Sequence, residues 1–246
     1  LSETHQTPVM ARIIREYAVS NGMVVYGPRM EPAMGEGFLR ERDRWNSLPI
    51  SVVPNHCRIH KRLEAMALEF SSSPFNALEG DGKKGVIATG YSYAKTLMAL
   101  EALPPQPLAI LKLGALFPLP EALVEEFLER KDEVLVVEEN EPFIEPMVRA
   151  LAQGRSLGTR VYGKSTRHLR WEGEINLRNL SRDLSRFLLG QDPGENVLQD
   201  EGKPMPSREG LCEGCPYIPA FDTFLEVVKE LGIPRPIITC DPGCAV

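Results

Sequence analysis

The sequence predicts an α/β fold: a three-layer, mostly parallel sheet with helices on both faces. Between residues 83 and 163, short and continuously apolar runs alternate with longer segments whose apolar residues recur at helical spacing. Alternation of this kind is typical of βαβ units. The apolar runs lack the polar positions of a half-exposed strand, so both faces of the sheet are expected to be covered.

The first unit begins with an apolar run at 85–90, expected as a strand, and Gly90 leads into a helix expected over 92–103. Prolines at 104, 105 and 107 end this helix, because a proline disfavours helical backbone in the residue before it. A second strand is then expected at 108–113.

The pattern repeats after residue 114. Pro120 marks the start of a helix, and the β-branched run at 134–137 predicts a third strand. A helix at 145–151 and a short strand at 159–162 complete the block.

The flanking segments follow other patterns. Residues 1–25 contain an apolar segment at 8–14, expected as a strand, and residues 26–82 are expected to be irregular apart from one helix at 56–70. Residues 164–206 are polar and rich in Gly and Pro, with a helix expected around 176–189, and are interpreted as a linker.

The last segment, 207–246, has a Cys-rich loop, a helix expected over 219–231 and a strand at 236–239. One helix and one strand cannot close a hydrophobic core. This segment is therefore expected to depend on parts that lie outside the sequence.

Composition narrows the function classes. The chain has 246 residues, 43% hydrophobic and 25% charged, as in ordinary globular proteins. A formal net charge of −6 argues against nucleic acid as a partner. The apolar stretches fall short of the ~20 residues that span a bilayer, and no secretory signal is visible. We expect no membrane partner and a cytoplasmic location.

Four of the five cysteines cluster near the end of the chain: Cys212 and Cys215 form a C-x-x-C-P motif, and Cys240 and Cys244 follow. In a cytoplasmic protein this clustering favours metal or redox chemistry over disulfides. Thiolates bind zinc and the iron of iron–sulfur clusters. The spacing of these cysteines differs from that of a zinc ribbon, so zinc, an iron–sulfur cluster and no metal at all remain alternatives. Cys57 is interpreted as an ordinary small hydrophobic residue.

Two other groups have a structural and a functional interpretation. The segment Glu138-Glu139-Asn140-Glu141 follows a predicted strand, where α/β sheets bind ligands, but its acids are better explained as caps of the next helix. His56 and His60 are four residues apart and are interpreted as helix surface. P-loop, G-x-S-x-G and G-x-G-x-x-G motifs are absent, so neither nucleotide hydrolysis nor α/β-hydrolase chemistry is supported. No catalytic residue is assigned.

Several motifs, in order, resemble the indolepyruvate:ferredoxin oxidoreductase family, in its alpha subunit. The central ones are 85–90 with Tyr93, 110–114 with 117–120, and 134–139 with 141–145. The resemblance extends to Thr7-Pro8-Val9, Arg44-Trp45, Leu48-Pro49, Cys212-Glu213-Gly214-Cys215-Pro216 and Asp241-Pro242-Gly243-Cys244, and so covers most of the chain.

The resemblance implies the middle of a longer domain order. Its parts would be the end of a pyrimidine-binding thiamine diphosphate domain (1–25), an irregular linker (26–82), a transketolase C-terminal-like domain (83–163), a second linker (164–206) and the start of a pyrophosphate-binding domain (207–246). The implied reaction is oxidative decarboxylation of an aryl 2-oxoacid such as indolepyruvate, with coenzyme A, to an acyl-CoA, CO2 and reduced ferredoxin.

The implied cofactors are thiamine diphosphate, magnesium and iron–sulfur clusters, and the implied partners are ferredoxin, coenzyme A and the remaining domains or subunits, in an oligomer. The cofactor-binding motifs lie outside this sequence, so the chain alone is expected to be inactive. Cysteines similar to Cys212, Cys215 and Cys244 hold a cluster in related enzymes; Cys240 is a weaker candidate.

Two positions depart from the family pattern: Tyr217 stands where the family usually has His, and Pro242 where it usually has Ile. These departures concern the identity of the substrate. Because the catalytic motifs lie outside the sequence, two alternatives stay open. The chain could be a non-catalytic α/β subunit-interaction module, or its terminal cysteines could form a small zinc-binding domain.

Overall fold

The computed structural model describes residues 2–14, 18, 21–28, 42–191 and 214–234. The chain divides into two units, Leu1–Gln199 and Asp200–Val246. Each unit is described by itself.

The first unit is built on a five-stranded sheet with the order β1-β3-β2-β4-β5. Its strands are β1 (Ala77–Gly80), β2 (Lys84–Thr89), β3 (Leu108–Leu113), β4 (Glu133–Val137) and β5 (Arg160–Tyr162). β2 pairs in parallel with β3 and β4, and β4 with β5, whereas β1 runs antiparallel to β3. The expectation of an α/β fold with a mostly parallel sheet is confirmed.

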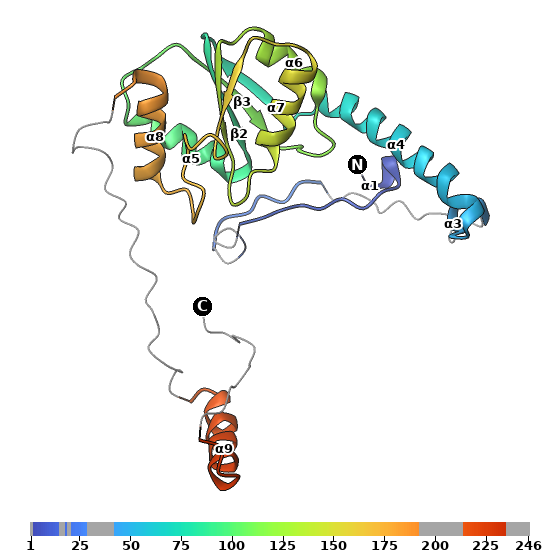
Figure 1. Ribbon diagram of the computed structural model, residues 1–246, viewed down its shortest axis with the longest axis vertical. Helices are drawn as coiled ribbons and strands as arrows, with labels where there is room; N and C mark the ends of the chain where they lie inside the picture. The colour runs from blue at the N-terminus through green and yellow to red at the C-terminus, as the bar shows by residue number, and fades with distance from the viewer. Residues whose placement is uncertain (1, 15–17, 19–20, 29–41, 192–213, 235–246) are drawn as a thin grey trace. The chain divides into compact units, whose positions relative to one another are not determined.

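Helices cover both faces of this sheet and form the outer two of three layers (Figure 1). They are α5 (Gly90–Glu101), α6 (Glu121–Glu129), α7 (Ile144–Gly154) and α8 (Leu177–Leu189). α5 contacts α8, and α6 contacts α7. Each helix follows a strand or the loop after it, as expected for βαβ units.

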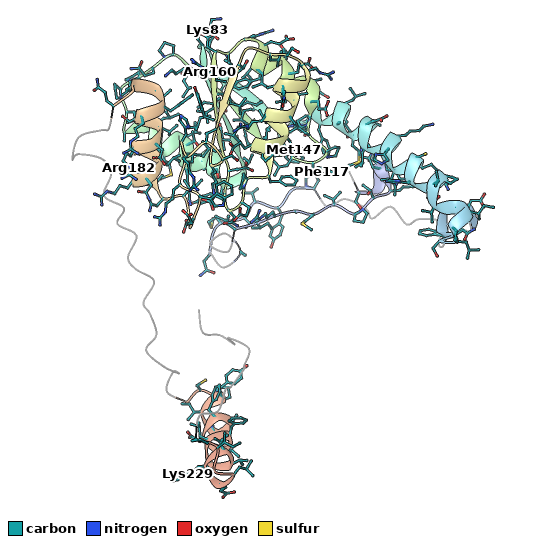
Figure 2. All side chains as sticks on the ribbon, viewed as in Figure 1. Lys83, Phe117, Met147, Arg160, Arg182 and Lys229 are labelled. Carbon is teal, nitrogen blue, oxygen red and sulfur yellow. The ribbon has the colours of Figure 1, made fainter. Side chains whose placement is uncertain are left out.

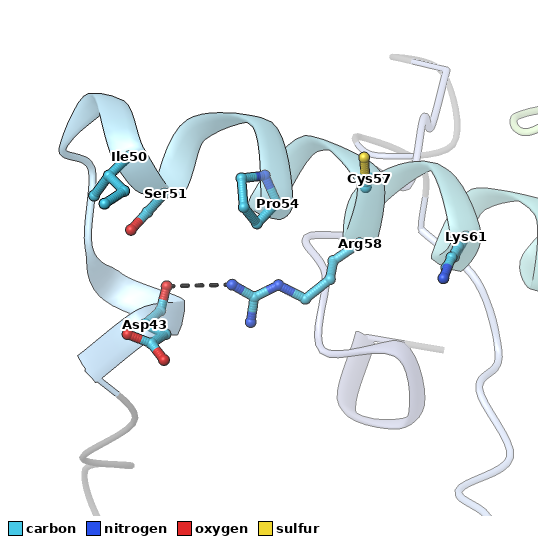
Figure 3. Close-up of a pocket in the computed structure, with 7 residues that line it drawn as sticks. All are labelled: Asp43, Ile50, Ser51, Pro54, Cys57, Arg58 and Lys61. Atoms are coloured by element: carbon cyan, nitrogen blue, oxygen red, sulfur yellow. Dashed lines mark hydrogen bonds between the residues drawn. The ribbon is translucent and has the colours of Figure 1, made fainter.

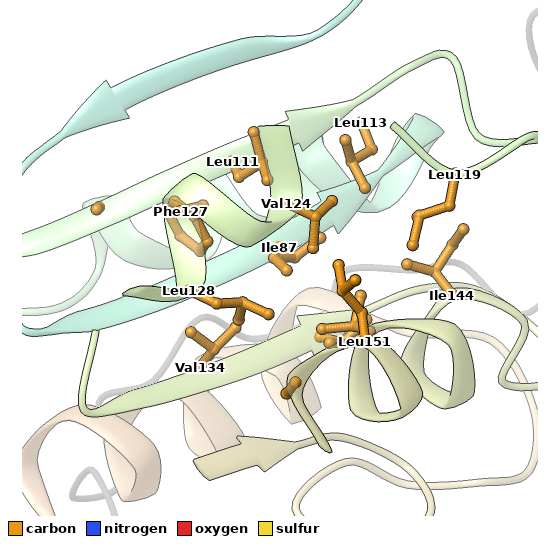
Figure 4. Close-up of a cluster of buried hydrophobic side chains, with 14 residues drawn as sticks. Ile87, Leu111, Leu113, Leu119, Val124, Phe127, Leu128, Val134, Ile144 and Leu151 are labelled. Carbon is orange, nitrogen blue, oxygen red and sulfur yellow. The ribbon is translucent and has the colours of Figure 1, made fainter. Parts of the chain in front are cut away.

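The core lies on both faces because neighbouring residues of each strand point in opposite directions. In β2, Val86 and Ala88 join the cluster beneath α5 and α8, whereas Ile87 joins the cluster beneath α6 and α7. Figure 4 shows the second cluster, in which Ile87, Val124, Phe127 and Leu128 converge. Burying one such side chain contributes ~1.5–3 kcal/mol, so these clusters are the main source of stability.

The sheet extends beyond the expected block. β1 lies in the segment expected to be irregular; its residues are mostly exposed, so it carries no apolar signal. Asn76 holds it in place: its Oδ1 accepts hydrogen bonds from the amides of Gly114 and Ala115, and its Nδ2 donates to the carbonyl of Phe70. α8, expected within a linker, begins at its Asn176 cap and packs on α5.

Before the sheet, two single-turn helices, α1 (Ser2–His5) and α3 (Arg42–Trp45), precede a long helix, α4 (Pro49–Ser71). α4 begins earlier than the expected helix at 56–70, because Pro49 is suited to a helix start. Only Met66 and Phe70 of α4 are buried. The strand expected at 8–14 does not form: these residues are largely exposed and irregular, and no strand among the described residues pairs with them.

The second unit contains α9 (Tyr217–Glu230), close to the helix expected at 219–231. Gly214 precedes it with φ +75°, a conformation that glycine adopts readily. The strand expected at 236–239 lies outside the described residues. Among the helices that the structure describes, none combines the length and apolar character of a membrane span.

Candidate functional site

The topological switch point of the sheet lies between β2 and β4. The connection leaving β2 runs through α5 to β3 on one side, whereas the connection leaving β4 runs through α7 to β5 on the other. α/β sheets bind ligands at this place, at the carboxyl ends of the strands. Figure 2 shows Lys83 and Arg160 at the opposite, amino end, and Phe117 at the carboxyl edge.

Glu138, directly after β4, is 3% exposed and caps α7. Its Oε2 accepts hydrogen bonds from the amides of Phe143 (2.9 Å) and Ile144 (2.7 Å), and its Oε1 from the amide of Glu145 (2.8 Å). A carboxylate at a helix N-terminus satisfies free amides and faces the positive end of the helix dipole. The helix-cap interpretation of this acidic segment is therefore confirmed for Glu138.

Lys164 lies at the same edge with its side chain fully buried. Its Nζ donates a hydrogen bond to the carbonyl of Asn140, a residue with φ +60°, a region in which asparagine is enriched. Burial lowers the pKa of Lys164 because it disfavours the charged form. Nearby carboxylates offset part of this effect: Glu138, Glu139, Glu141 and Glu145.

Lys95, on α5, links the two sides of the switch point. Its Nζ lies 2.7 Å from Glu139 Oε1 and 2.7 Å from Glu174 Oε1. Burial lowers the pKa of Lys95, but the hydrogen bonds to Glu139 and Glu174 outweigh burial, so its pKa is raised. Lys95 is therefore held in its charged form.

The loop 163–176, which follows β5, crosses this edge and is fixed there by four polar contacts. Two come from Lys164 and Glu174, described above. The third is from Trp171 Nε1 to Glu141 Oε2 (3.0 Å), and the fourth from the Ser165 amide to Glu145 Oε2 (3.0 Å). The place where an α/β sheet usually binds its ligand is thus occupied by the chain's own hydrogen bonds and ion pairs. We name the residues that make these contacts the edge network: Lys95, Glu138, Glu139, Asn140, Glu141, Glu145, Lys164, Ser165, Trp171 and Glu174.

Sequence reasoning missed Lys95, Lys164 and loop 163–176. Lys164 stands at the start of a polar segment with no motif around it. Its burial depends on β5 pairing with β4, which brings residues distant in sequence together. No local pattern could have revealed it.

The edge network does not fit a thiamine diphosphate site. Glu138 is engaged with the amides of α7, and Glu139 with Lys95. Glu141 is engaged with Trp171, and Glu145 with the Ser165 amide. Since each of these carboxylates already has a partner within the chain, we derive no cofactor step from them.

The expected cysteine ligands cannot be brought together from the described residues. Cys215 is described and buried within its unit, whereas Cys212, Cys240 and Cys244 lie outside the described part of the chain. Within that part, no group of three or more His, Cys, Asp or Glu side chains could hold a metal ion.

Cys57 is exposed on α4, where it lines an open pocket of about 430 Å³ (Figure 3). Arg58 and Lys61 line the same pocket, and Arg58 Nη2 donates to the carbonyl of Asp43 at 3.3 Å. The pocket is remote in sequence from the edge network and contains none of its residues.

An exposed aromatic pair borders the edge network. Phe117, in the loop after β3, is 58% exposed, and Phe143, before α7, is 52% exposed. Their ring centroids lie 6.3 Å apart. Large aromatic side chains exposed together are typical of surfaces that a protein partner covers.

Comparisons with known proteins give the same family as the motifs in the sequence. A family model described as an indolepyruvate oxidoreductase domain matches residues 77–204. The indolepyruvate oxidoreductase subunit IorA of Archaeoglobus fulgidus is 33% identical over 259 residues, which cover 99% of this chain and 39% of that protein. The subunit of the same name from Pyrococcus abyssi is 30% identical over 258 residues, with the same coverage.

Among solved structures, a 2-oxoglutarate:ferredoxin oxidoreductase from Magnetococcus marinus is similar to part of the chain. It is 18% identical, with a TM-score of 0.36, and the match covers 48% of this chain and 21% of that chain. The chain spans about two fifths of the length of the curated relatives that it matches.

Proposed function

Because the chain belongs to the indolepyruvate oxidoreductase family, we propose that it forms the middle part of an arylpyruvate:ferredoxin oxidoreductase. The observation that carries this proposal is the match of the family model to residues 77–204. The proposed reaction is thiamine diphosphate-dependent oxidative decarboxylation of a 2-oxoacid such as indolepyruvate. Coenzyme A takes the acyl group, CO2 leaves, and ferredoxin takes two electrons.

In this proposal the described residues support the enzyme and do not perform its chemistry. The thiamine ylid supplies the carbon chemistry when the cofactor is bound, and the magnesium, thiamine and iron–sulfur sites belong largely to the segments that complete the enzyme. The domain order 1–25, 26–82, 83–163, 164–206 and 207–246, with a transketolase C-terminal-like domain at 83–163, is part of the proposal. So is assembly with further subunits into an oligomer.

The proposed function predicts activity of the assembled enzyme with aryl 2-oxoacids. Enzyme that contains this chain, purified anaerobically, is expected to reduce ferredoxin with indolepyruvate only when thiamine diphosphate and coenzyme A are both present. Ferredoxin reduction is followed by absorbance, and acyl-CoA by mass spectrometry. The matched comparison is a small aliphatic 2-oxoacid under the same conditions.

Two outcomes of this assay would count against the proposal. Turnover of the aliphatic acid without turnover of indolepyruvate would overturn the substrate class. An assembled complex without thiamine-dependent turnover would favour the alternative, a non-catalytic subunit-interaction module. The filled switch point and the exposed pair Phe117 and Phe143 are the observations that favour this alternative.

For the C-terminal cysteines we propose a metal site formed by Cys212, Cys215 and Cys244, with Cys240 as a further candidate. A cytoplasmic location is part of this proposal, because thiols stay reduced there. Anaerobically purified protein is expected to contain stoichiometric metal that is lost in the Cys212→Ser/Cys244→Ser variant. Iron with sulfide would identify a cluster, and zinc alone a zinc-binding domain.

Cys57→Ser is the matched control for this experiment. It removes a single thiol on α4, in the other unit. It should leave the metal content unchanged. A folded wild-type protein that contains no metal, or a double variant that keeps its metal, would show that these cysteines are not ligands.

A further inference from the structure

The first half of α4 carries two histidines whose rings are in contact. His56 and His60 lie one helical turn apart, and both residues are exposed. Their Nε2 atoms are 3.0 Å apart, and their ring centroids 4.5 Å. The i, i+4 spacing places the two side chains on one face, but it does not by itself bring the two Nε2 atoms within reach of one ion. The structure adds this proximity.

From this geometry we propose that His56 and His60 bind a divalent transition metal ion of the kind that prefers imidazole, with Ni²⁺ or Cu²⁺ favoured over Zn²⁺. In the metal-free chain, one Nε2 donates its hydrogen to the other, as the distance between them indicates. For the ion to bind, the donor ring moves this proton to its Nδ1 through water. Both Nε2 lone pairs then face the ion, and a neutral pair releases no net proton.

The distance between the nitrogens decides which ions fit. Metal–imidazole bonds are about 2.0–2.1 Å long, so two nitrogens 3.0 Å apart subtend an angle of about 90–97° at the ion. This angle suits neighbouring positions of the square-planar, tetragonal or octahedral geometries that Cu²⁺ and Ni²⁺ adopt. The tetrahedral geometry of Zn²⁺ requires the rings to separate slightly.

The surroundings make this a site with two protein ligands. No third His, Cys, Asp or Glu completes it among the residues that the structure describes, so water fills the other positions. The cations nearby on α4 are Arg58, Lys61 and Arg62, and they oppose a second positive charge. Two of them are directed elsewhere: Arg58 Nη2 donates to the carbonyl of Asp43, and Arg62 Nη1 to that of Gln6.

A bound ion would also stabilise this half of α4. Its only buried residues, Met66 and Phe70, lie near the other end of the helix. Helices gain most of their stability from tertiary packing, and the first turns of α4 have little of it. An ion that bridges consecutive turns replaces part of the missing packing, so amide exchange around residues 52–60 should slow.

The test is calorimetric titration of the whole chain with NiCl2 in a non-chelating buffer. Wild-type protein is expected to bind one more Ni²⁺ ion than the His56→Gln/His60→Gln variant. Each single variant should bind that ion at least about tenfold more weakly, a loss of about 1.4 kcal/mol. His168→Gln is the matched control: it removes an exposed histidine that stacks on Tyr162, not on another histidine.

Hydrogen exchange supplies an independent readout. Ni²⁺ should slow exchange in α4 of the wild type and of His168→Gln, but not in the double variant. Equal stoichiometry and affinity in the wild type and the double variant would overturn the proposal, because the ion would then bind at the cysteines or elsewhere. Failure of the wild type to bind any Ni²⁺ would overturn it as well. Neither result depends on oxidoreductase activity.

Discussion

Glu138→Ala is expected to lower the free energy of unfolding by about 3–5 kcal/mol, the range seen when one partner of a buried charged group is removed. The substitution leaves three amides at the start of α7 without an acceptor, in a place closed to water. It also removes one of the carboxylates that offset the burial of Lys164. Urea unfolding followed by circular dichroism measures the loss.

Glu138→Gln separates the hydrogen bonds from the charge. The amide oxygen of Gln can still accept from the helix, but its NH2 group faces an amide donor, so the expected cost is about half that of Ala. Glu141→Ala is the control: Glu141 is exposed and bonds Trp171, and its loss should cost less than about 1 kcal/mol. Equal destabilisation by Glu138→Ala and Glu141→Ala would contradict the capping role.

The sequence was sufficient to predict the centre of the fold because the signals there are local. β2, β3 and β4 are largely buried on both faces, so each is a mostly apolar run with little ambiguity. β1 was not predicted because it is an exposed edge strand. It is held by backbone pairing with β3 and by the hydrogen bonds of Asn76, and neither produces an apolar pattern in the sequence. The prediction for segment 8–14 was wrong for the opposite reason: the segment has the apolar pattern of a strand, but no described strand pairs with it.

The edge network was only half predictable for the same reason. Glu138 precedes the helix that it caps by a few residues, so local reasoning could propose its role. Lys164 and Glu174 reach the network from the far side of β5, and their contacts to Asn140 and Lys95 exist only once the sheet has formed. The convergence of His56 and His60 depends on side-chain rotamers that residue spacing does not fix.

Lys164 gives the second large prediction, a dependence of stability on pH. Burial holds the pKa of Lys164 below its ordinary value of 10.5 in the folded chain. The unfolded chain therefore binds this proton more tightly. Between the lowered pKa and 10.5 the unfolded state carries more protons than the folded state, so the free energy of unfolding rises with pH across that window. The slope is at most about 1.4 kcal/mol per pH unit.

The measurement compares wild type with Lys164→Met by urea unfolding at several pH values from about 7 to 10. The wild type should gain stability relative to the variant as pH rises. Lys95→Met is the matched control, because the pKa of Lys95 is raised: its stabilising contribution is fully present below 10.5 and is lost only as pH rises through the higher folded value. Wild type and Lys95→Met should therefore stay nearly parallel over the same range. If the difference in the free energy of unfolding between wild type and Lys164→Met did not change with pH, burial would not lower the pKa of Lys164 at this edge.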